Sequence, residues 1–271
     1  MQNGIHMISG LPRAGSTLLG ALLRQNPALH AGMTSPVGGL FSVLRRELSA
    51  TNETSVFVDD AQREAMLRGL FTGYYQAIHP THTVIDTNRL WCSQLHAVSA
   101  LFPEARVIAC VRHLPWIIDS IETLIRRNLW QTSKIFDFEA GGTVWSRANA
   151  LTSANGLVGF AWNALKQAYY SNESDRMMVL TYDTLTNRPG QALEAVYAFL
   201  GLEHFEHDFE NIEFDATDFD ARIGTPGLHT VRPSVGPTER RTILPPDLWA
   251  RFEGDSFWRD PKLNLRGVKV V

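Results

Sequence analysis

The sequence predicts an α/β fold with three layers, in which helices cover both faces of a central parallel sheet. The first observation is that short apolar runs alternate with amphipathic segments of helical spacing along the chain. The second is a glycine-containing loop, residues 10–17, between an apolar run at 5–8 and a helical run at 18–23. Strand, glycine loop and helix in this order are typical of a P-loop-NTPase-like core, because the loop N–H groups and the helix N-terminus attract phosphate.

Length and composition predict one soluble domain that spans residues 1–271. The net charge of −3 gives no basic field for nucleic acid, and no apolar run is long enough to cross a membrane. Cys92 and Cys110 follow no metal or redox spacing, so two buried thiols in a reducing compartment are expected. These observations predict a cytoplasmic protein.

The elements follow from apolar periodicity and from glycine and proline breaks. After the first strand and the phosphate loop, three more strands are predicted, and the one at 106–111 is apolar enough to lie in the centre of the sheet. Residues 128–158 are rich in Gly, Ser, Thr and Asn, which predicts an irregular lid or acceptor-binding region. The predicted strands are 5–8, 83–86, 106–111 and 177–180, and the predicted helices are 18–23, 40–48, 59–77, 92–101, 116–127, 160–170, 188–200 and 248–252.

The phosphate loop differs from a nucleotide triphosphatase at one position. Its spacing matches the pattern G-x-x-x-x-G-K-[ST], but Ser16 stands where the lysine would be. The nearest cation, Arg13, lies inside the loop. The residue that would bridge the β- and γ-phosphates of ATP is therefore absent.

Polar residues at neighbouring strand ends predict a second anion site. Ligands of open parallel sheets bind at the carboxyl ends of the strands, where the loop, Asp86 to Arg89, Arg112 and Tyr182 should converge. Ser120 follows Arg112 by eight residues and falls just over a turn inside the next helix. An arginine and a hydroxyl together suit a phosphate, so the sequence predicts a ligand with two separate anionic groups.

These two motifs resemble those of sulfotransferases. Leu11-Pro12-Arg13-Ala14-Gly15-Ser16-Thr17 resembles their 5′-phosphosulfate loop, and the run 107–112 with Ser120 resembles their 3′-phosphate site. The likeness continues through Phe102-Pro103-Glu104-Ala105-Arg106, Ala161-Trp162-Asn163 and the run 179–182. Residues 231–236 and 244–247 are similar to the C-terminal part of tyrosylprotein sulfotransferases.

The resemblance implies transfer of a sulfuryl group from 3′-phosphoadenosine 5′-phosphosulfate (PAPS) to an acceptor hydroxyl, without a metal, leaving adenosine 3′,5′-bisphosphate (PAP). It implies that Arg13 assists the transfer and that residues 223–246 cover the donor. The donor-binding residues that it implies are Leu11, Pro12, Arg13, Ala14, Gly15, Ser16, Thr17, Arg112, Ser120 and Tyr182.

The catalytic residues of tyrosylprotein sulfotransferases are only partly matched. Their acceptor base is a glutamate after the first helix, but residues 31–39 contain no acid, and Thr87 stands about where they have a lysine. Asp86, at a strand end, is the expected base, and Arg89 would replace the lysine. His113 is the reserve base. The alternative for Asp86 is a structural role, as an N-cap or in an ion pair with Arg89. His229 belongs to no motif, so a surface or core role is expected.

The acceptor remains open at this stage between a protein tyrosine and a small phenol or alcohol. A peptide acceptor with acidic neighbours would need local cations, for which Arg45, Arg46, Arg126 and Arg127 are the candidates. A homodimer is possible. The alternative functions are a kinase or nucleotide triphosphatase, with Asp86 holding Mg²⁺, and a nucleotide-binding protein that no longer catalyses.

Overall fold

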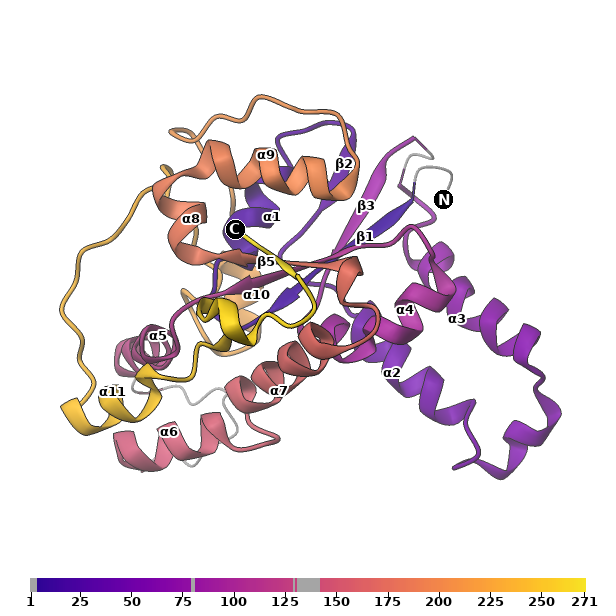
Figure 1. Cartoon of the computed structure of the whole chain (residues 1–271), viewed down its shortest axis with the longest axis horizontal. Coiled ribbons are helices and arrows are strands. Elements are labelled where there is room, and N and C mark those ends of the chain that lie inside the picture. Colours follow the sequence, from indigo (N-terminus) through magenta and orange to yellow (C-terminus); the bar gives the residue numbers. More distant parts are fainter. Residues whose placement is uncertain (1–3, 79–80, 129, 131–141) are drawn as a thin grey trace.

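The computed structural model describes residues 4–78, 81–128, 130 and 142–271. These residues form a six-stranded sheet in the order β2-β3-β1-β4-β5-β6, and every pairing in it is parallel. In Figure 1, α1, α8 and α9 lie on one side of the sheet, and α6 and α7 lie on the other. The α/β fold class is therefore confirmed. The strands are β1 (Ile5–Gly10), β2 (Leu29–Ala31), β3 (Thr83–Thr87), β4 (Val107–Val111), β5 (Met177–Thr181) and β6 (Lys269–Val270).

The strands predicted from apolar runs are present with ends shifted by at most two residues. β4 lies between β1 and β5 and is buried at every position, as its sequence predicts. Gly201 ends α9 in the left-handed conformation that caps helices. The helices are α1 (Ser16–Leu23), α2 (Val37–Glu47), α3 (Asp60–Tyr74), α4 (Leu95–Leu101), α5 (Leu114–Arg127), α6 (Val144–Thr152), α7 (Leu157–Tyr170), α8 (Tyr182–Asn187), α9 (Pro189–Leu200), α10 (Thr217–Arg222) and α11 (Pro246–Glu253), with a 3₁₀ helix η2 (Arg89–Gln94).

Several short elements escape the sequence prediction. β2 and β6 have three and two residues and exist only through pairing with β3 and β5. α6 and the start of α7 occupy part of the region 128–158 that was predicted to be irregular, so that prediction is wrong for residues 144–152 and 157–158. Residues 129 and 131–141 lie outside the described part. Thr143 starts α6 by accepting a hydrogen bond from the Ser146 N–H at 3.2 Å. A single capping residue in a polar stretch is not enough to predict a helix from the sequence.

Gly10 fixes the end of β1 against β4. Its φ is +103°, and a Cβ atom at this position would lie 2.2 Å from the Cys110 carbonyl oxygen. The Leu11 N–H donates to that same oxygen at 2.8 Å. Only glycine allows this approach, which places the start of the phosphate loop directly beside the end of β4.

None of the helices in the described part of the chain has the length and apolar character needed to cross a bilayer.

Buried His6 on β1 should make the fold sensitive to acid. Burial, with a smaller effect of Arg106, lowers the pKa of His6 from 6.5 to about 4, and its Nδ1 accepts from the Arg106 N–H at 3.2 Å. The unfolded chain therefore binds a proton that the folded chain excludes, and stability falls as the pH drops from about 6.5 to about 4. The loss is about 3 kcal/mol, since one pKa unit is worth about 1.4 kcal/mol. Denaturant unfolding at several pH values measures it.

His6→Asn is the control, because it retains a neutral acceptor near the position of Nδ1 and does not titrate in this range. The difference in unfolding free energy between the two proteins should change with pH only in the window named above. A difference that stays constant from pH 7 to 4 would contradict the assignment to His6.

Candidate active site

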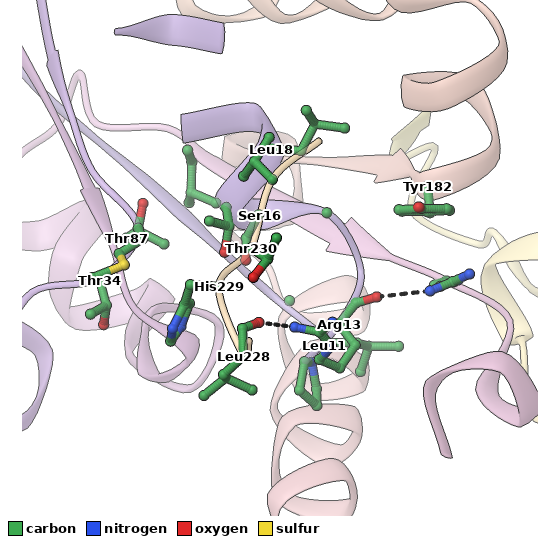
Figure 2. A pocket seen from close by; sticks show the side chains of 18 of the residues that line it. Leu11, Arg13, Ser16, Leu18, Thr34, Thr87, Tyr182, Leu228, His229 and Thr230 are labelled. Carbon is green, nitrogen blue, oxygen red and sulfur yellow. Dashed lines mark hydrogen bonds between the residues drawn. The ribbon is translucent and has the colours of Figure 1, made fainter. Parts of the chain in front are cut away.

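A cavity of about 340 Å³ lies at the carboxyl ends of the parallel strands. This is the edge where open α/β sheets bind their ligands. Figure 2 shows side chains from the phosphate loop, from β3 and from the C-terminal segment, residues 223–246, around this space. Its volume lies within the range typical of small-molecule sites.

The phosphate loop forms one wall of the cavity. Gly15, at φ +95°, precedes α1, whose first backbone N–H groups have no partner within the helix. Arg13 has φ +57°, a left-handed conformation that is rare for side chains with a Cβ and is common at ligand-binding loops. Ala14 is buried and does not line the cavity, unlike Leu11, Pro12, Arg13, Gly15, Ser16 and Thr17.

Arg13 and Arg112 meet at one side of this wall. The Arg13 Nε donates to Ser120 Oγ at 3.1 Å, and the Arg112 guanidinium lies 4.1 Å from the centre of the Tyr182 ring. Burial, with the charges of Arg112 and Arg240, lowers the pKa of Arg13 to about 10. Burial likewise lowers the pKa of Arg112. This concentration of positive charge favours an anion.

The structure does not divide the two arginines between two sites as the sequence predicts. Ser120 was expected beside Arg112 at the second phosphate, but its hydroxyl accepts from Arg13 of the loop. Arg13 also donates through Nη1 to the Leu228 carbonyl oxygen, and Arg112 donates to the Arg13 carbonyl oxygen at 3.4 Å. Arg13 therefore connects the phosphate loop with α5 and with the C-terminal segment through hydrogen bonds.

A buried carboxylate on α5 holds the C-terminal segment in place. Asp119, which is fully buried, pairs with Arg240 at 2.6 Å. Its Oδ2 accepts from Thr242 Oγ1 at 2.9 Å and from the Ile243 N–H at 2.8 Å. Residues of this segment that line the cavity include Leu228 to Arg232. The C-terminal segment thus forms a second wall of the cavity, although it is far from the phosphate loop in the sequence.

Asp86 lies outside the cavity, contrary to the expectation that it is the base. It is 1% exposed and is not among the cavity-lining residues. Its carboxylate accepts hydrogen bonds from Ser35 Oγ, from the Tyr75 hydroxyl and, at 2.6 Å, from Trp91 Nε1. Burial raises the pKa of Asp86, and these three hydrogen bonds lower it in part. The geometry gives Asp86 a structural role.

The other two candidates for proton transfer and charge stabilisation differ in position. Arg89 lines the cavity, and burial lowers its pKa. Its role as a replacement for the lysine stays a prediction. No ion pair joins it to Asp86 in the described part of the chain. His113 does not line the cavity, and its Nε2 lies 3.1 Å from the Glu253 carbonyl oxygen. His113 is therefore badly placed to act as a base.

Sequence reasoning missed a group of polar residues across the cavity from the loop. Thr34 lines it from the piece that lacks the family's glutamate, and Thr87 lines it from the end of β3. His229 lines it from the C-terminal segment, with its ring against Phe219. For Thr87 the sequence signal is its place about where tyrosylprotein sulfotransferases have a lysine, and this does not predict a role for the threonine itself. For His229 no sequence signal exists, since nothing near it is periodic.

The sequence comparisons identify the family. A family model described as "Sulfotransferase family" matches residues 7–207, which include the phosphate loop, Arg112, Ser120 and Tyr182. The chain therefore belongs to the sulfotransferase family. Among curated proteins, no sequence matches it. The particular likeness to tyrosylprotein sulfotransferases stays a prediction.

One of the solved structures similar to this chain supports the same fold. The sulfotransferase domain from the curacin biosynthetic pathway aligns with a TM-score of 0.52 and 16% identity, over 94% of this chain and 92% of that one. The sulfotransferase domain of the Synechococcus PCC 7002 olefin synthase gives 0.47 and 18%, over 93% and 88%. A sulfotransferase from Alicyclobacillus acidocaldarius gives 0.49 and 16%, over 94% and 93%. At 16% identity, the likeness to the curacin-pathway domain concerns the fold alone.

Proposed function

We propose that this chain is a PAPS-dependent sulfotransferase that acts on a small phenol or alcohol. The observation that carries the proposal is the meeting of Arg13, Arg112 and Ser120 beside a phosphate loop at the strand ends. Arginine forks and backbone N–H groups are the usual ligands of phosphate and sulfate groups. A donor that carries both a 5′-phosphosulfate and a 3′-phosphate would satisfy them together.

The residues present fit such a donor. The loop backbone, the start of α1 and the hydroxyls of Ser16 and Thr17 would hold the 5′ end, where charge grows as the sulfuryl group leaves. Arg112 and Arg13, the latter bonded to Ser120, would hold the 3′-phosphate. When bound, the donor supplies the activated sulfuryl group. Independence from metal ions stays a prediction.

The cavity walls favour a small acceptor over an acidic peptide. None of the four arginines suggested for peptide binding lines the cavity. Arg45 donates to Gln94 at 2.6 Å, Arg46 pairs with Glu47, and Arg126 pairs with Glu122. Apolar side chains that include Leu157, Phe219 and Val235 line the cavity instead. A compact apolar alcohol or phenol suits these walls better.

A kinase or nucleotide triphosphatase is the weaker candidate. Ser16 lines the cavity at the position where a P-loop lysine would reach the phosphates. Asp86, the expected Mg²⁺ ligand for that function, is buried under three hydrogen bonds outside the cavity. Neither part of a metal–triphosphate site is in place.

Titration calorimetry and thermal unfolding with PAP against ATP–Mg²⁺ test the proposal. PAP should bind and stabilise the fold by about 3 kcal/mol at a hundredfold excess over its dissociation constant. ATP–Mg²⁺ should have little effect, because its phosphates form one chain and do not reach both ends of the site. Tight Mg²⁺-dependent binding of ATP with no response to PAP would overturn the proposal.

A further inference from the structure

We propose that His229 is the base that accepts the proton of the acceptor hydroxyl, held in place by Asp220. This inference rests on the proposed sulfotransferase function and names the residue that the sequence motifs leave unassigned. His229 belongs to the C-terminal segment, and Asp220 lies on α10. Neither residue belongs to the phosphate loop or to the Arg112 motif.

The residues that line the cavity include few side chains that could act as the base. Within the described part of the chain, the residues that line the cavity include no aspartate and no glutamate, and His229 is the one histidine among them. The other side chains there that ionise are arginines, which stay protonated, and Tyr182, whose ring is covered by Arg112. An imidazole is the side chain in this set that suits proton transfer near neutral pH.

Hydrogen bonding fixes which nitrogen of His229 is available. Its Nδ1 lies 2.6 Å from Asp220 Oδ1, and its backbone N–H donates to Asp220 Oδ2 at 2.8 Å. A carboxylate can only accept here, so the neutral imidazole carries its proton on Nδ1 and has its lone pair on Nε2. No partner of Nε2 occurs among the described residues. The free nitrogen thus belongs to a side chain that borders the cavity.

The pair is largely shielded from solvent. Asp220 is 2% exposed, and the side chain of His229 is 18% exposed. The ring of Phe219 packs edge-on against the imidazole with centroids 5.4 Å apart. Figure 2 shows His229 between Thr34 and Thr87 on one side and the phosphate loop on the other. A carboxylate that orients a histidine in this way also stabilises the imidazolium that forms during proton transfer.

The step balances as follows. The acceptor oxygen forms a bond to the sulfur of PAPS while its proton moves to Nε2 of His229. The bond between sulfur and the bridging oxygen of the 5′-phosphate breaks, and the electron pair stays on that phosphate in PAP. The products are the sulfate ester, PAP and a protonated His229, which then loses its proton to solvent.

Acceptors of different acidity give the decisive test. With PAPS as donor, His229→Gln should lower kcat by about 10²–10⁴-fold for unsubstituted phenol, which must lose its proton during the reaction. For 4-nitrophenol, a much stronger acid of which a large fraction is already ionised near neutral pH, the loss should be much smaller. A purely structural change would lower both rates alike. PAP affinity, measured by calorimetry, should stay within about twofold, since kcat and binding separate for a group used only in the transition state.

A matched control and a second readout keep the result interpretable. His113→Gln removes a histidine at the same edge of the sheet but outside the cavity and should leave both rates unchanged. Nitrogen-15 NMR of the PAP-bound protein should place the His229 proton on Nδ1, and Asp220→Asn should remove this preference. Equal loss for both phenols, or a proton found on Nε2, would overturn the assignment. If PAP fails to bind the wild-type protein, the proposed function itself is wrong.

Discussion

Asp86→Ala is expected to lower the unfolding free energy by about 3–5 kcal/mol. The substitution leaves Ser35 Oγ, the Tyr75 hydroxyl and Trp91 Nε1 without their acceptor, and Tyr75 and Trp91 are buried. Each buried donor that loses its partner costs about 1–3 kcal/mol, while removal of a desolvated carboxylate offsets part of that cost. Urea or guanidinium unfolding at neutral pH measures the change.

Asp86→Asn separates the structural role from a catalytic one. It keeps one acceptor oxygen at this position and should destabilise the fold less than Asp86→Ala. Its kcat should remain close to that of the wild type once the protein is folded. A fall of about 10²–10⁴-fold in kcat, with PAP affinity and stability unchanged, would restore Asp86 as the base.

Arg112→Ala is expected to weaken PAP binding by about 2–4 kcal/mol, which is roughly 30- to 1000-fold in the dissociation constant. Arg112 lines the cavity, stacks on Tyr182 and donates to the backbone of the phosphate loop. In the proposed donor complex, loss of Arg112 would remove one of the two charged partners of the 3′-phosphate and leave Arg13 as the other. Titration calorimetry with PAP measures the effect.

Arg127→Ala is the matched control for Arg112→Ala. Arg127 is exposed at the end of α5, does not line the cavity, and its removal changes the net charge by the same amount. Its variant should bind PAP with nearly the wild-type affinity. Equal losses in the two variants would mean that general electrostatic attraction, and not a built phosphate site, holds the ligand.

Local patterns were sufficient to predict the core and one wall of the cavity. The apolar runs predict β1, β3, β4 and β5, because strands buried on both faces need continuous apolar sequence. The rule that ligands bind at the carboxyl ends of parallel strands placed Arg112 near the loop, whereas the contact of Ser120 with Arg13 was not predicted. Both predictions depend on residues that are close in sequence or on a rule that holds for parallel sheets in general.

Apolar runs and motif spacing do not predict which side chain at a strand end faces the cavity. Successive side chains of a strand point to opposite faces, so Asp86 and Thr87 cannot both reach the ligand. In the structure Thr87 lines the cavity, and Asp86 faces Tyr75 and Trp91. Asp86 is the predicted base because its carboxylate can accept a proton, but its position in β3 directs its side chain away from the cavity.

His229 was beyond the reach of sequence patterns for a different reason. It lies in a segment without helical or strand periodicity, and its position depends on contacts of Asp119 and Asp220 across the chain. A single sequence does not reveal such pairings. They become visible only when the segment is seen against α5 and the phosphate loop.

The attachment of the C-terminal segment to Asp119 has a consequence for the order of folding. Residues 5–181 contain the strands β1, β3, β4 and β5, which can pair before the rest of the chain is available. The second wall of the cavity requires closing a loop of more than a hundred residues between Asp119 and Thr242, at an entropic cost repaid by a few buried contacts. The ability to hold an anionic ligand should thus be the last property that the folding chain acquires.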